Sequence, residues 1–415
     1  MSYAISGECC SEASCVAVCP MNCIHPSPGQ PGFGTGAGLF IDPRTCIDCG
    51  ACADICPVDA AQPANRATAA DVERNAAYFA DREPLDGTDL DAWHPPAYQT
   101  WGGGPRRVLV AGAGPAGMYA TRELLLRSSA EVTLVDRLDR VGGLVRFGVA
   151  PDHLQTKQII STFERIAEHP RVHWRPGTDA ADAGAEYDAV VHAVGAYQSR
   201  RLAIPGEETA CTAEDFVAWY NGRPGAMLPI ELTGPRAVVV GTGNVALDLA
   251  RILLSDERRL AKMDLPDVVR RTLARSGIRE VLLLGRRGRD DAAYSASALQ
   301  EMSAFPGAEL RFEARPVRWS AAGLELDTGE TIAAGNLFTA IGFEGRPIDG
   351  LPFDPNRGIV PNVRGAVVGR PGHYVAGWIK RGARGGIGVN KACAQETVQT
   401  LLAAEQAVMA LPAAG

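Results

Sequence analysis

Short, uninterrupted runs of apolar residues recur along the chain, and several of them end in glycine. Val108–Ala111 leads directly into Gly112-x-Gly114-x-x-Gly117, after which apolar residues return with helical spacing. A run without polar alternation favours a strand that is buried on both faces, as in a parallel sheet. The pattern therefore predicts a buried strand, a tight turn and a helix in succession.

The glycine spacing is typical of a turn that binds a dinucleotide. The first glycine allows the turn, the second admits a pyrophosphate, and the third lets helix and strand pack closely. A second strand, Val132–Val135, ends in Asp136, where an acid contacts the ribose hydroxyls. An acid there favours a cofactor without a 2′-phosphate, FAD or NAD. The expected contacts are Gly112, Gly114, Pro115, Ala116, Gly117 and Asp136.

The same pattern of strand, glycine-rich turn and helix returns at Arg236–Asp248. Ala246 replaces the third glycine, and the next strand, Glu280–Leu284, is followed by Arg286 and Arg287. Guanidinium groups bind a 2′-phosphate bidentately, so this second site is predicted to select NADPH over NADH. Plain surface charge is the alternative interpretation of the two arginines. The other expected contacts are Gly241, Gly243, Asn244 and Val245.

Nine of the eleven cysteines lie before residue 57, which favours metal or redox chemistry over disulfides. Cys46-x2-Cys49-x2-Cys52-x3-Cys56-Pro57 has the spacing of a bacterial iron–sulfur module. Upstream, Cys9-x2-Glu12-x2-Cys15-x3-Cys19-Pro20 repeats this spacing with Glu12 in one cysteine position. The doubled spacing disfavours the alternative of a zinc-binding module.

In such a repeat each half lends its last cysteine to the other cluster. We therefore expect one [4Fe–4S] cluster on Cys19, Cys46, Cys49 and Cys52. The other cluster, on Cys9, Cys15 and Cys56, has Glu12 at its fourth corner. Carboxylate is a poor substitute for thiolate, so a [3Fe–4S] cluster is predicted there. A [4Fe–4S] cluster stays open if Glu12, Cys10 or water completes it. Cys10 and Cys23 are treated as non-ligands near the clusters.

Charge divides the chain unevenly. Residues 1–60 carry a net charge of −5 and residues 61–104 a net charge of −4, which leaves +2 for the remainder. This distribution disfavours nucleic acid as a partner and indicates self-docking or a charged redox partner. No apolar run is long enough to span a membrane, and the N-terminus lacks the pattern of a signal peptide. A cytoplasmic location is expected.

Several further motifs appear in a familiar order: GAGPAG, GGLVRFGVAPDH, GTGNVALDLARILL, GRRG and AGWIKRG. Over residues 105–400 they resemble the adrenodoxin reductase-type ferredoxin–NADP reductases. The first 60 residues resemble seven- or eight-iron bacterial ferredoxins, and the whole chain resembles bacterial reductases that carry their own ferredoxin. The resemblance implies FAD and NADP(H) as cofactors beside the two clusters.

The resemblance also implies roles for single residues. His153 matches a histidine near the isoalloxazine and nicotinamide, while Glu301 and Asp248 match acids near the nicotinamide. Trp378 stands where the family places a tryptophan against the flavin. Two positions depart from the family: Ala298 replaces a glutamate that contacts ribose, and Arg384 is unusual. Further implied flavin contacts are Gly143, Leu144, Val145, Gly385, Gly386 and Ile387.

The expected architecture is multidomain. An α+β ferredoxin module (1–60) and a linker (61–104) precede two α/β Rossmann-like domains of the glutathione reductase type. The FAD-binding domain comprises 105–205 and 335–415, and the NADP-binding domain (206–334) is inserted in it. Within the linker, a polar helix is expected at Ala69–Asp81, and Trp93, Tyr98 and Trp101 are expected to pack on the surface.

The resulting hypothesis is an enzyme, a flavin-dependent NADPH:ferredoxin oxidoreductase. It moves electrons between NADPH, FAD and the fused clusters, then to an external ferredoxin or cytochrome-type acceptor. Two alternatives remain open at this point. One is an NADPH-oxidising subunit of a larger enzyme, similar to the small subunit of glutamate synthase. The other is a redox-sensing flavoprotein that holds FAD without turnover.

Overall fold

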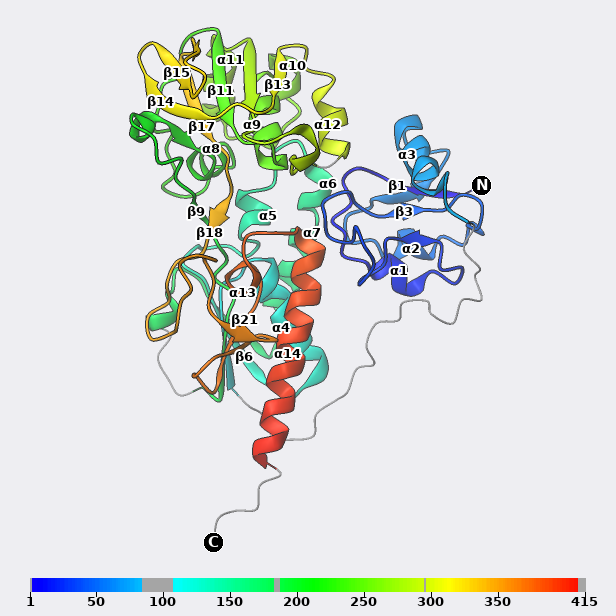
Figure 1. Ribbon diagram of the computed structural model, residues 1–415. Helices are drawn as coiled ribbons and strands as arrows, with labels where there is room; N and C mark the ends of the chain where they lie inside the picture. Colours follow the sequence, from blue (N-terminus) through cyan, green and yellow to red (C-terminus); the bar gives the residue numbers. More distant parts are fainter. Residues whose placement is uncertain (1, 84–106, 183–186, 295, 410–415) are drawn as a thin grey trace. The chain divides into compact units, whose positions relative to one another are not determined.

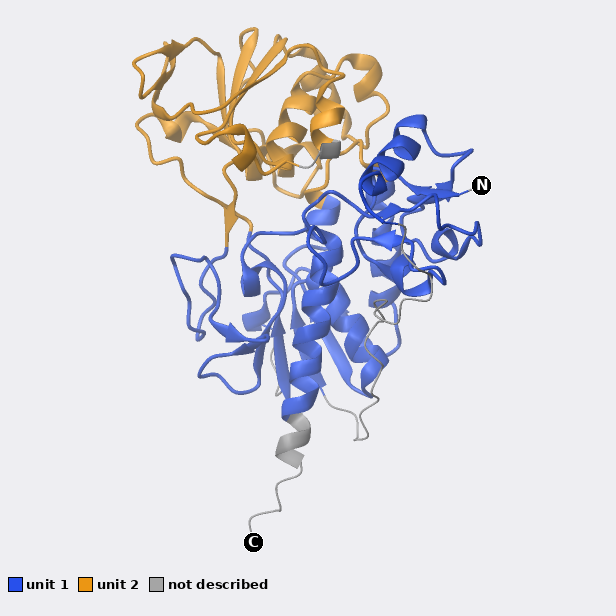
Figure 2. Ribbon diagram, turned by 45° about the vertical axis from the view of Figure 1, so that its right-hand side comes forward, with its two compact units in different colours: residues 1–146, 155–196, 345–415 blue, residues 147–154, 197–344 orange. Residues whose placement is uncertain are grey.

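The computed structural model of the chain describes residues 2–83, 107–182, 187–294 and 296–409. The fold divides into two compact units, which Figure 2 distinguishes by colour. The first unit comprises 1–146, 155–196 and 345–415, and the second comprises 147–154 and 197–344. The second unit is thus inserted in the first, and it is longer than the expected insertion at 206–334.

The N-terminal part of the first unit is a small α+β module. β1 pairs with β4, and β2 pairs with β3, each pair in antiparallel register. Two short helices, α1 and α2, begin just before a cysteine in each half of the sequence repeat. The elements are β1 (Tyr3–Ile5), α1 (Ser14–Val18), β2 (Ile24–His25), β3 (Phe40–Ile41), α2 (Ala51–Asp54), β4 (Ala61–Pro63) and α3 (Ala69–Phe79).

This module extends beyond residue 60. Asn75 of α3 accepts hydrogen bonds from the backbone N–H groups of Ile5 (3.1 Å) and Ile41 (2.8 Å). The buried Phe79 anchors the end of the same helix. The helix expected at Ala69–Asp81 is present as α3, but β4 and α3 belong to the module and not to a linker, because their backbone and side chains complete it. The aromatic residues Trp93, Tyr98 and Trp101 lie outside the described residues.

The remainder of the first unit is built on a seven-stranded sheet with the order β19-β20-β21-β8-β5-β6-β7. The five strands from β21 to β7 are parallel, as the uninterrupted apolar runs predict. Helices α4 and α14 lie side by side (Figure 1). The strands are β5 (Arg107–Ala111), β6 (Glu131–Val135), β7 (Val172–Arg175), β8 (Ala189–His192), β19 (Asn362–Val363), β20 (Ala366–Val367) and β21 (His373–Val375). The helices are α4 (Pro115–Arg127), α5 (Leu144–Phe147), α6 (Leu154–Lys157), α7 (Ile159–Ala167), α13 (Trp378–Arg381) and α14 (Ile387–Met409).

The second unit contains a five-stranded parallel sheet with the order β10-β17-β11-β12-β13. A pair, β9 and β18, and a three-stranded antiparallel sheet, β14–β16, accompany it. The strands are β9 (Gln198–Ser199), β10 (Cys211–Thr212), β11 (Arg236–Val240), β12 (Glu280–Leu284), β13 (Ala308–Arg311), β14 (Pro316–Ser320), β15 (Gly323–Leu326), β16 (Thr331–Ile332), β17 (Asn336–Thr339) and β18 (Phe343–Glu344). The helices are α8 (Ala213–Tyr220), α9 (Asn244–Leu253), α10 (Glu257–Leu260), α11 (Asp267–Arg275) and α12 (Ala296–Met302).

Both faces of this second sheet are buried. Ala237 and Val239 of β11 join an apolar core with residues of α8, α9 and α11. Their neighbours Val238 and Val240 join a second core with residues of β15 and β16. Because successive side chains of a strand point to opposite faces, a strand covered on both sides needs apolar residues throughout. This requirement explains the sequence RAVVV.

The two sheets share one order around their central strands. In the first, β8 and β6 flank β5, with β7 beyond β6; in the second, β17 and β12 flank β11, with β13 beyond β12. The expected α/β fold with two dinucleotide-type domains is confirmed. In the part of the chain that the structure describes, no helix has both the length and the apolar character needed to cross a membrane.

Candidate functional site

The first glycine-rich turn joins β5 to α4, and two of its glycines are required by close contacts. Gly112 has a φ of +107°, and a Cβ there would lie 2.5 Å from the carbonyl oxygen of Ala193. A Cβ on Gly117 would lie 1.7 Å from the carbonyl oxygen of Gly112. Any larger side chain would push the helix away from the strands. The turn therefore keeps the start of α4 close to the end of the sheet, where its free N–H groups can bind phosphate.

Asp136 lies at the expected place, directly after β6. Its carboxylate accepts hydrogen bonds from the N–H groups of Ala113 (2.7 Å) and Leu138 (2.9 Å). Burial raises the pKa of Asp136, while these two N–H groups act in the opposite direction. The bond to Ala113 attaches the acid to the glycine-rich turn. The carboxylate is thereby fixed beside the place where a ribose would follow the pyrophosphate.

Other predicted cofactor contacts lie against the start of α4. A Cβ on Gly143 would lie 2.8 Å from the Cα atom of Gly114. A Cβ on Gly377 would lie 2.5 Å from the Cβ atom of Ala116. Next to these glycines, Val145 is buried, whereas Leu144 is exposed. The structure thus brings the 112–117, 143–145 and 377–378 segments together, as a common cofactor site requires.

The C-terminal part of this site contains Arg381, whose Nη2 atom donates to Asn390 Oδ1 (3.1 Å). The Nε and Nη1 atoms of Arg381 are buried and make no hydrogen bond among the described residues. Burial lowers the pKa of Arg381, because the charged guanidinium is poorly solvated there. Nearby, the indole N–H of Trp378 donates to the carbonyl oxygen of Gly385 (3.1 Å), which holds the tryptophan beside Gly386 and Ile387. Unsatisfied cationic donors fit an anionic cofactor such as FAD.

The second glycine-rich turn, in the second unit, joins β11 to α9. Gly241 has a φ of +139°, and a Cβ there would lie 2.3 Å from the carbonyl oxygen of Ala340. Gly243 caps α9, whose first two residues are the predicted contacts Asn244 and Val245. Since a Cβ on Gly285 would lie 3.0 Å from the Thr242 side chain, the chain leaves β12 directly beside this turn.

Arg286 and Arg287 follow Gly285, and both side chains are exposed. Arg287 lies 3.8 Å from the carboxylate of Asp291, a loose contact that a bound phosphate could replace. Ala298, where the family has a glutamate, packs against the apolar core of this unit. Two exposed guanidinium groups thus follow the residue that lies beside the second glycine-rich turn, and residue 298 contributes no acid.

The three residues implied as catalytic, His153, Asp248 and Glu301, converge on one residue that the sequence analysis missed. Arg251 of α9 forms ion pairs with Asp248 (2.6 Å), with Glu301 (3.7 Å) and with Asp152. Its side chain is only 6% exposed. The pattern ALDLARILL reads as an ordinary amphipathic helix, so nothing local marks Arg251 except a charge on the buried face.

Within this cluster His153 lies between a donor and an acceptor. Its Nε2 atom is 3.2 Å from Arg251 Nη2 and 3.4 Å from Glu301 Oε2. A guanidinium can only donate, so a neutral ring accepts from Arg251 through Nε2 and carries its proton on Nδ1. A protonated ring instead donates from Nε2 to Glu301. The arrangement suits a group that exchanges a proton.

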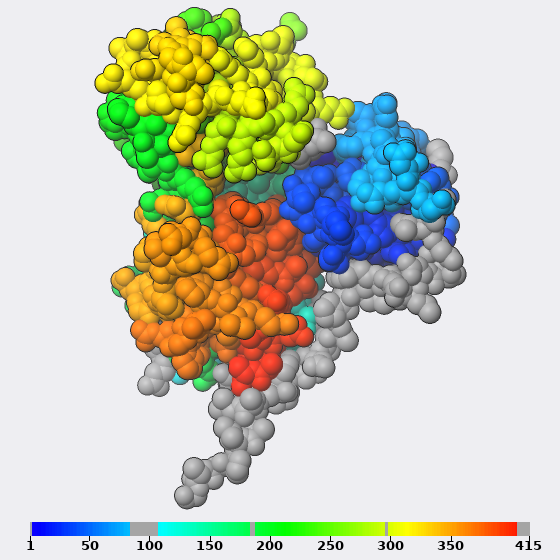
Figure 3. Space-filling model, in the orientation of Figure 1, coloured from blue at the N-terminus to red at the C-terminus, as the bar shows by residue number. Residues whose placement is uncertain are grey.

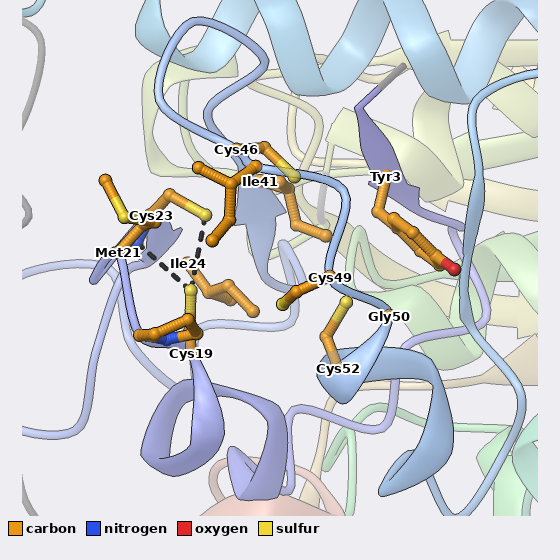
Figure 4. Close-up of a pocket in the computed structure, with 12 residues that line it drawn as sticks. Tyr3, Cys19, Met21, Cys23, Ile24, Ile41, Cys46, Cys49, Gly50 and Cys52 are labelled. Atoms are coloured by element: carbon orange, nitrogen blue, oxygen red, sulfur yellow. Dashed lines mark hydrogen bonds between the residues drawn. The ribbon is translucent and has the colours of Figure 1, made fainter.

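Four of the seven predicted cluster ligands line one pocket in the N-terminal module. These are Cys19, Cys46, Cys49 and Cys52, and Figure 4 shows their sulfur atoms around a common space with Cys23. The Cys23 thiol lies 3.3 Å from Cys19 Sγ. Hydrogen bonding from Cys23 lowers the pKa of Cys46 to about 5, and it lowers the pKa of Cys19 as well. Thiolates are the form that binds iron.

The spacing of these side chains disfavours a single metal ion. Among the described residues, no three His, Cys, Asp or Glu side chains converge closely enough to hold one ion. Zinc requires its ligands at about 2.3 Å from one centre, whereas an iron–sulfur cluster separates its four thiolates over several metal atoms. A pocket lined by four cysteines without single-ion geometry fits a cluster.

The other three predicted ligands also lie near one another. Cys15 is buried, and its pKa is raised well above the usual value by burial and by the neighbouring Cys9 and Cys56. Cys9 Sγ accepts from the N–H of Ser11 (3.4 Å), and Cys56 Sγ accepts from the N–H of Ala60 (3.2 Å). Such N–H···S bonds stabilise thiolates that ligate iron.

The comparisons agree with this arrangement. Residues 106–397 match the family described as pyridine nucleotide-disulphide oxidoreductase, and residues 8–60 match a 4Fe-4S dicluster domain. The chain therefore belongs to the pyridine nucleotide-disulphide oxidoreductases, with a dicluster ferredoxin domain in front. Solved structures include FprA of Mycobacterium tuberculosis in complex with NADPH, with a TM-score of 0.69 and 33% identity. This match covers 74% of the present chain and 86% of FprA.

Sequence relatives define the branch within that family. The chain is 37% identical, over an alignment 481 positions long, to the probable ferredoxin/ferredoxin–NADP reductases of Mycobacterium bovis and M. tuberculosis. Each alignment covers 97% of the present chain and 84% of the relative. The chain is thus a member of the ferredoxin–NADP reductases with a fused ferredoxin domain. Thioredoxin reductase of T. acidophilum, at 17% identity and a TM-score of 0.51, shares the fold alone.

The cluster around Arg251 yields a stability prediction. Arg251→Met leaves the Asp152 and Asp248 carboxylates without their common cation, and we expect it to lower the free energy of unfolding by about 3 kcal/mol. This value is at the low end for a broken ion pair because both acids keep some contact with solvent. Chemical denaturation measures the change. Arg258→Met, at an exposed arginine of α10, is the control and should change stability by less than about 0.5 kcal/mol. Equal effects of the two substitutions would contradict a structural role for Arg251.

Proposed function

We propose that this chain oxidises NADPH and passes the electrons, through FAD and two iron–sulfur clusters in its own N-terminal module, to an external one-electron acceptor. Each turnover converts one NADPH and two oxidised acceptors into NADP⁺, one proton and two reduced acceptors. The observation that carries the proposal is the presence, in one chain, of two dinucleotide-type turns and a pocket lined by four cysteines. FAD supplies the chemistry that joins a two-electron donor to one-electron carriers.

The protein's own residues bind and orient the participants in this scheme. The glycine-rich turn after β5 and Asp136 would hold FAD, and the turn after β11 with Arg286 and Arg287 would hold NADPH. His153 and Glu301 would bind and release the proton of the reaction, because an imidazole can exchange a proton. Arg251 would fix the orientation of the imidazole ring. By this assignment residues 107–196 and 345–409 form the FAD-binding domain and 197–344 most of the NADP-binding domain.

Each cluster takes its last cysteine from the other half of the cysteine repeat. We assign a [4Fe–4S] cluster to Cys19, Cys46, Cys49 and Cys52. The second cluster, on Cys9, Cys15 and Cys56, has three thiolates and is assigned as [3Fe–4S]. This assignment is supported by Glu12, whose carboxylate oxygens already accept from Lys391 Nζ and from the N–H of Ser14. A carboxylate with two protein partners is a poor candidate for a fourth iron ligand.

The first test concerns electron flow as a whole. Anaerobic addition of NADPH to the purified protein should bleach the flavin absorbance, and added ferredoxin or cytochrome c should then be reduced. Flavin that stays oxidised in the presence of NADPH would contradict the proposal and favour a flavoprotein without turnover. A bleached flavin with no reduction of an added acceptor would favour an input subunit that requires a partner enzyme.

The second test concerns the choice of nicotinamide. Arg286→Ala combined with Arg287→Ala should raise the KM for NADPH by about tenfold or more, equivalent to at least about 1.4 kcal/mol, because charge-assisted contacts to the 2′-phosphate are lost. The KM for NADH should change little. Steady-state kinetics with both cofactors measures the effect, and Arg318→Ala, at an exposed arginine of β14, is the control. An equal rise in KM for NADPH and NADH would show that the arginines do not bind the 2′-phosphate.

The third test concerns the cluster on Cys9, Cys15 and Cys56. Electron paramagnetic resonance of the air-oxidised protein should show a [3Fe–4S] signal, since an oxidised [4Fe–4S] cluster is silent. Chemical analysis should find about seven irons per chain, the sum of a three-iron and a four-iron cluster. A silent oxidised protein that shows two [4Fe–4S] signals on reduction would reject the three-iron assignment.

A further inference from the structure

Two contacts bring the N-terminal module onto the start of α14, within the first unit. The N–H of Gly388 donates to the carbonyl oxygen of Cys10 (3.1 Å). A Cβ on Gly388 would lie 1.6 Å from the carbonyl oxygen of Ser11, so only glycine permits this approach. In the space-filling view the module, coloured blue, lies against the C-terminal segment, coloured red (Figure 3). The backbone of the module at Cys10 and Ser11 is therefore in direct contact with the backbone at the start of α14.

A partly buried ion pair lies next to this backbone contact. Lys391, one turn into α14, donates to Glu12 Oε1 at 2.5 Å. The same ammonium group donates to Ser14 Oγ (3.0 Å) and to the carbonyl oxygen of Glu12 (3.3 Å). The side chains are 14% and 10% exposed. Lys391 thus has three acceptors, as many as its three N–H groups can serve, and all three belong to the module.

Glu12 occupies a specific place in the cysteine repeat. It stands where the second half of the repeat has Cys49, a residue that lines the four-cysteine pocket. Its other carboxylate oxygen accepts from the N–H of Ser14 (3.0 Å), so both oxygens are directed to partners outside a cluster. The same position of the repeat is thus a predicted iron ligand in the second half, Cys49, and a contact to the neighbouring domain in the first half, Glu12.

Other contacts lie further along the same border and involve neutral donors. Thr156 Oγ1 donates to the carbonyl oxygen of Glu8 (2.9 Å) and lies 3.1 Å from its carboxylate. Ser6 Oγ donates to Gln155 Oε1 at 3.4 Å. These bonds are longer than the 2.5 Å bond between Lys391 and Glu12, and none of their donors is charged. Removing one partner of an ion pair that is largely shielded from water weakens a contact strongly, so Lys391 should carry most of the positioning.

We propose that Lys391 is a docking residue, which holds Glu12 and thereby fixes the Cys9/Cys15/Cys56 half of the module against the start of α14. That half is then the one next to the flavin-binding domain. A short route of bonds leads from Ile387 through the Gly388 N–H and the Cys10 carbonyl to Cys9, a predicted iron ligand. The Cys46–Cys52 half, with its exposed Cys49, is left for an external acceptor.

This inference rests on the proposed function only for its consequence, the rate at which the clusters receive electrons. The contact itself can be tested without turnover. Lys391 lies on another domain than the cysteines, so replacing it removes no iron ligand. Glu12 lies three residues from each of two predicted ligands, Cys9 and Cys15. It is therefore substituted only in combination with a change at Lys391.

The experiment uses the full-length, cofactor-loaded protein with Lys391→Met and Lys391→Glu, and with Lys262→Glu at an exposed lysine as control. Hydrogen–deuterium exchange of the oxidised protein should show lost protection in residues 9–16 and 387–392 of both Lys391 variants. Iron and sulfide content should equal that of the parent. After rapid mixing with NADPH, flavin bleaching should keep its rate, while cluster reduction should slow by about tenfold or more because the carriers are no longer held in place.

The paired exchange Glu12→Lys with Lys391→Glu should restore protection relative to Lys391→Glu alone, since the opposite charges meet again. Parent-like protection and parent-like cluster reduction in both Lys391 variants would overturn the docking role. Lost protection with unchanged cluster reduction would support the docking contact and overturn its stated consequence, the control of electron transfer to the clusters. If the parent protein itself fails to reduce its clusters with NADPH, the proposed function fails, and the exchange data still decide whether the contact exists.

Discussion

The structure depends most on how closely the backbone approaches itself at the first glycine of each dinucleotide-type turn. Gly112 faces the carbonyl oxygen of Ala193, and Gly241 faces that of Ala340, at distances that exclude a Cβ. In both cases the carbonyl belongs to the residue that follows the neighbouring strand, β8 or β17. The parallel sheet order, the turn and the helix start are therefore fixed together. Free N–H groups at the carboxyl edge of each sheet, the condition for binding a dinucleotide, follow from this one constraint.

The sequence was most informative where chemistry depends on spacing along the chain. The glycine-rich turns, the strands that enter them and the cysteine repeat are local patterns, and the structure places Cys19, Cys46, Cys49 and Cys52 around one pocket. The boundary at residue 60 failed for a different reason. β4 and α3 carry no cysteine and little hydrophobic pattern, and they join the module through pairing with β1 and through Asn75. A single asparagine with long-range backbone partners leaves no periodic signal.

The residues that sequence analysis missed are those that act through space. Arg251 binds Asp152 and Glu301, which come from separate segments, in addition to Asp248 of its own helix. Lys391 meets Glu12 across 379 positions of sequence. Arginine and lysine are ordinary residues on a helix, and only the fold shows that Asp152, Glu301 and Glu12 lie beside them.

The acidic residues of the N-terminal module bear on two contacts in the proposed electron path, one with the flavin-binding domain and one with an external acceptor. The acidic N-terminal segment is consistent with self-docking or with a charged partner, and the structure divides its acids accordingly. Glu12 is partly buried against Lys391, whereas Asp48, Asp54 and Asp59 are exposed in the segment that carries Cys49 and Cys52. A buried pair fixes geometry and is little affected by salt, while exposed charges steer a mobile partner and are screened. The same sign of charge thus serves a permanent contact at one end of the module and leaves the other end suited to a transient one.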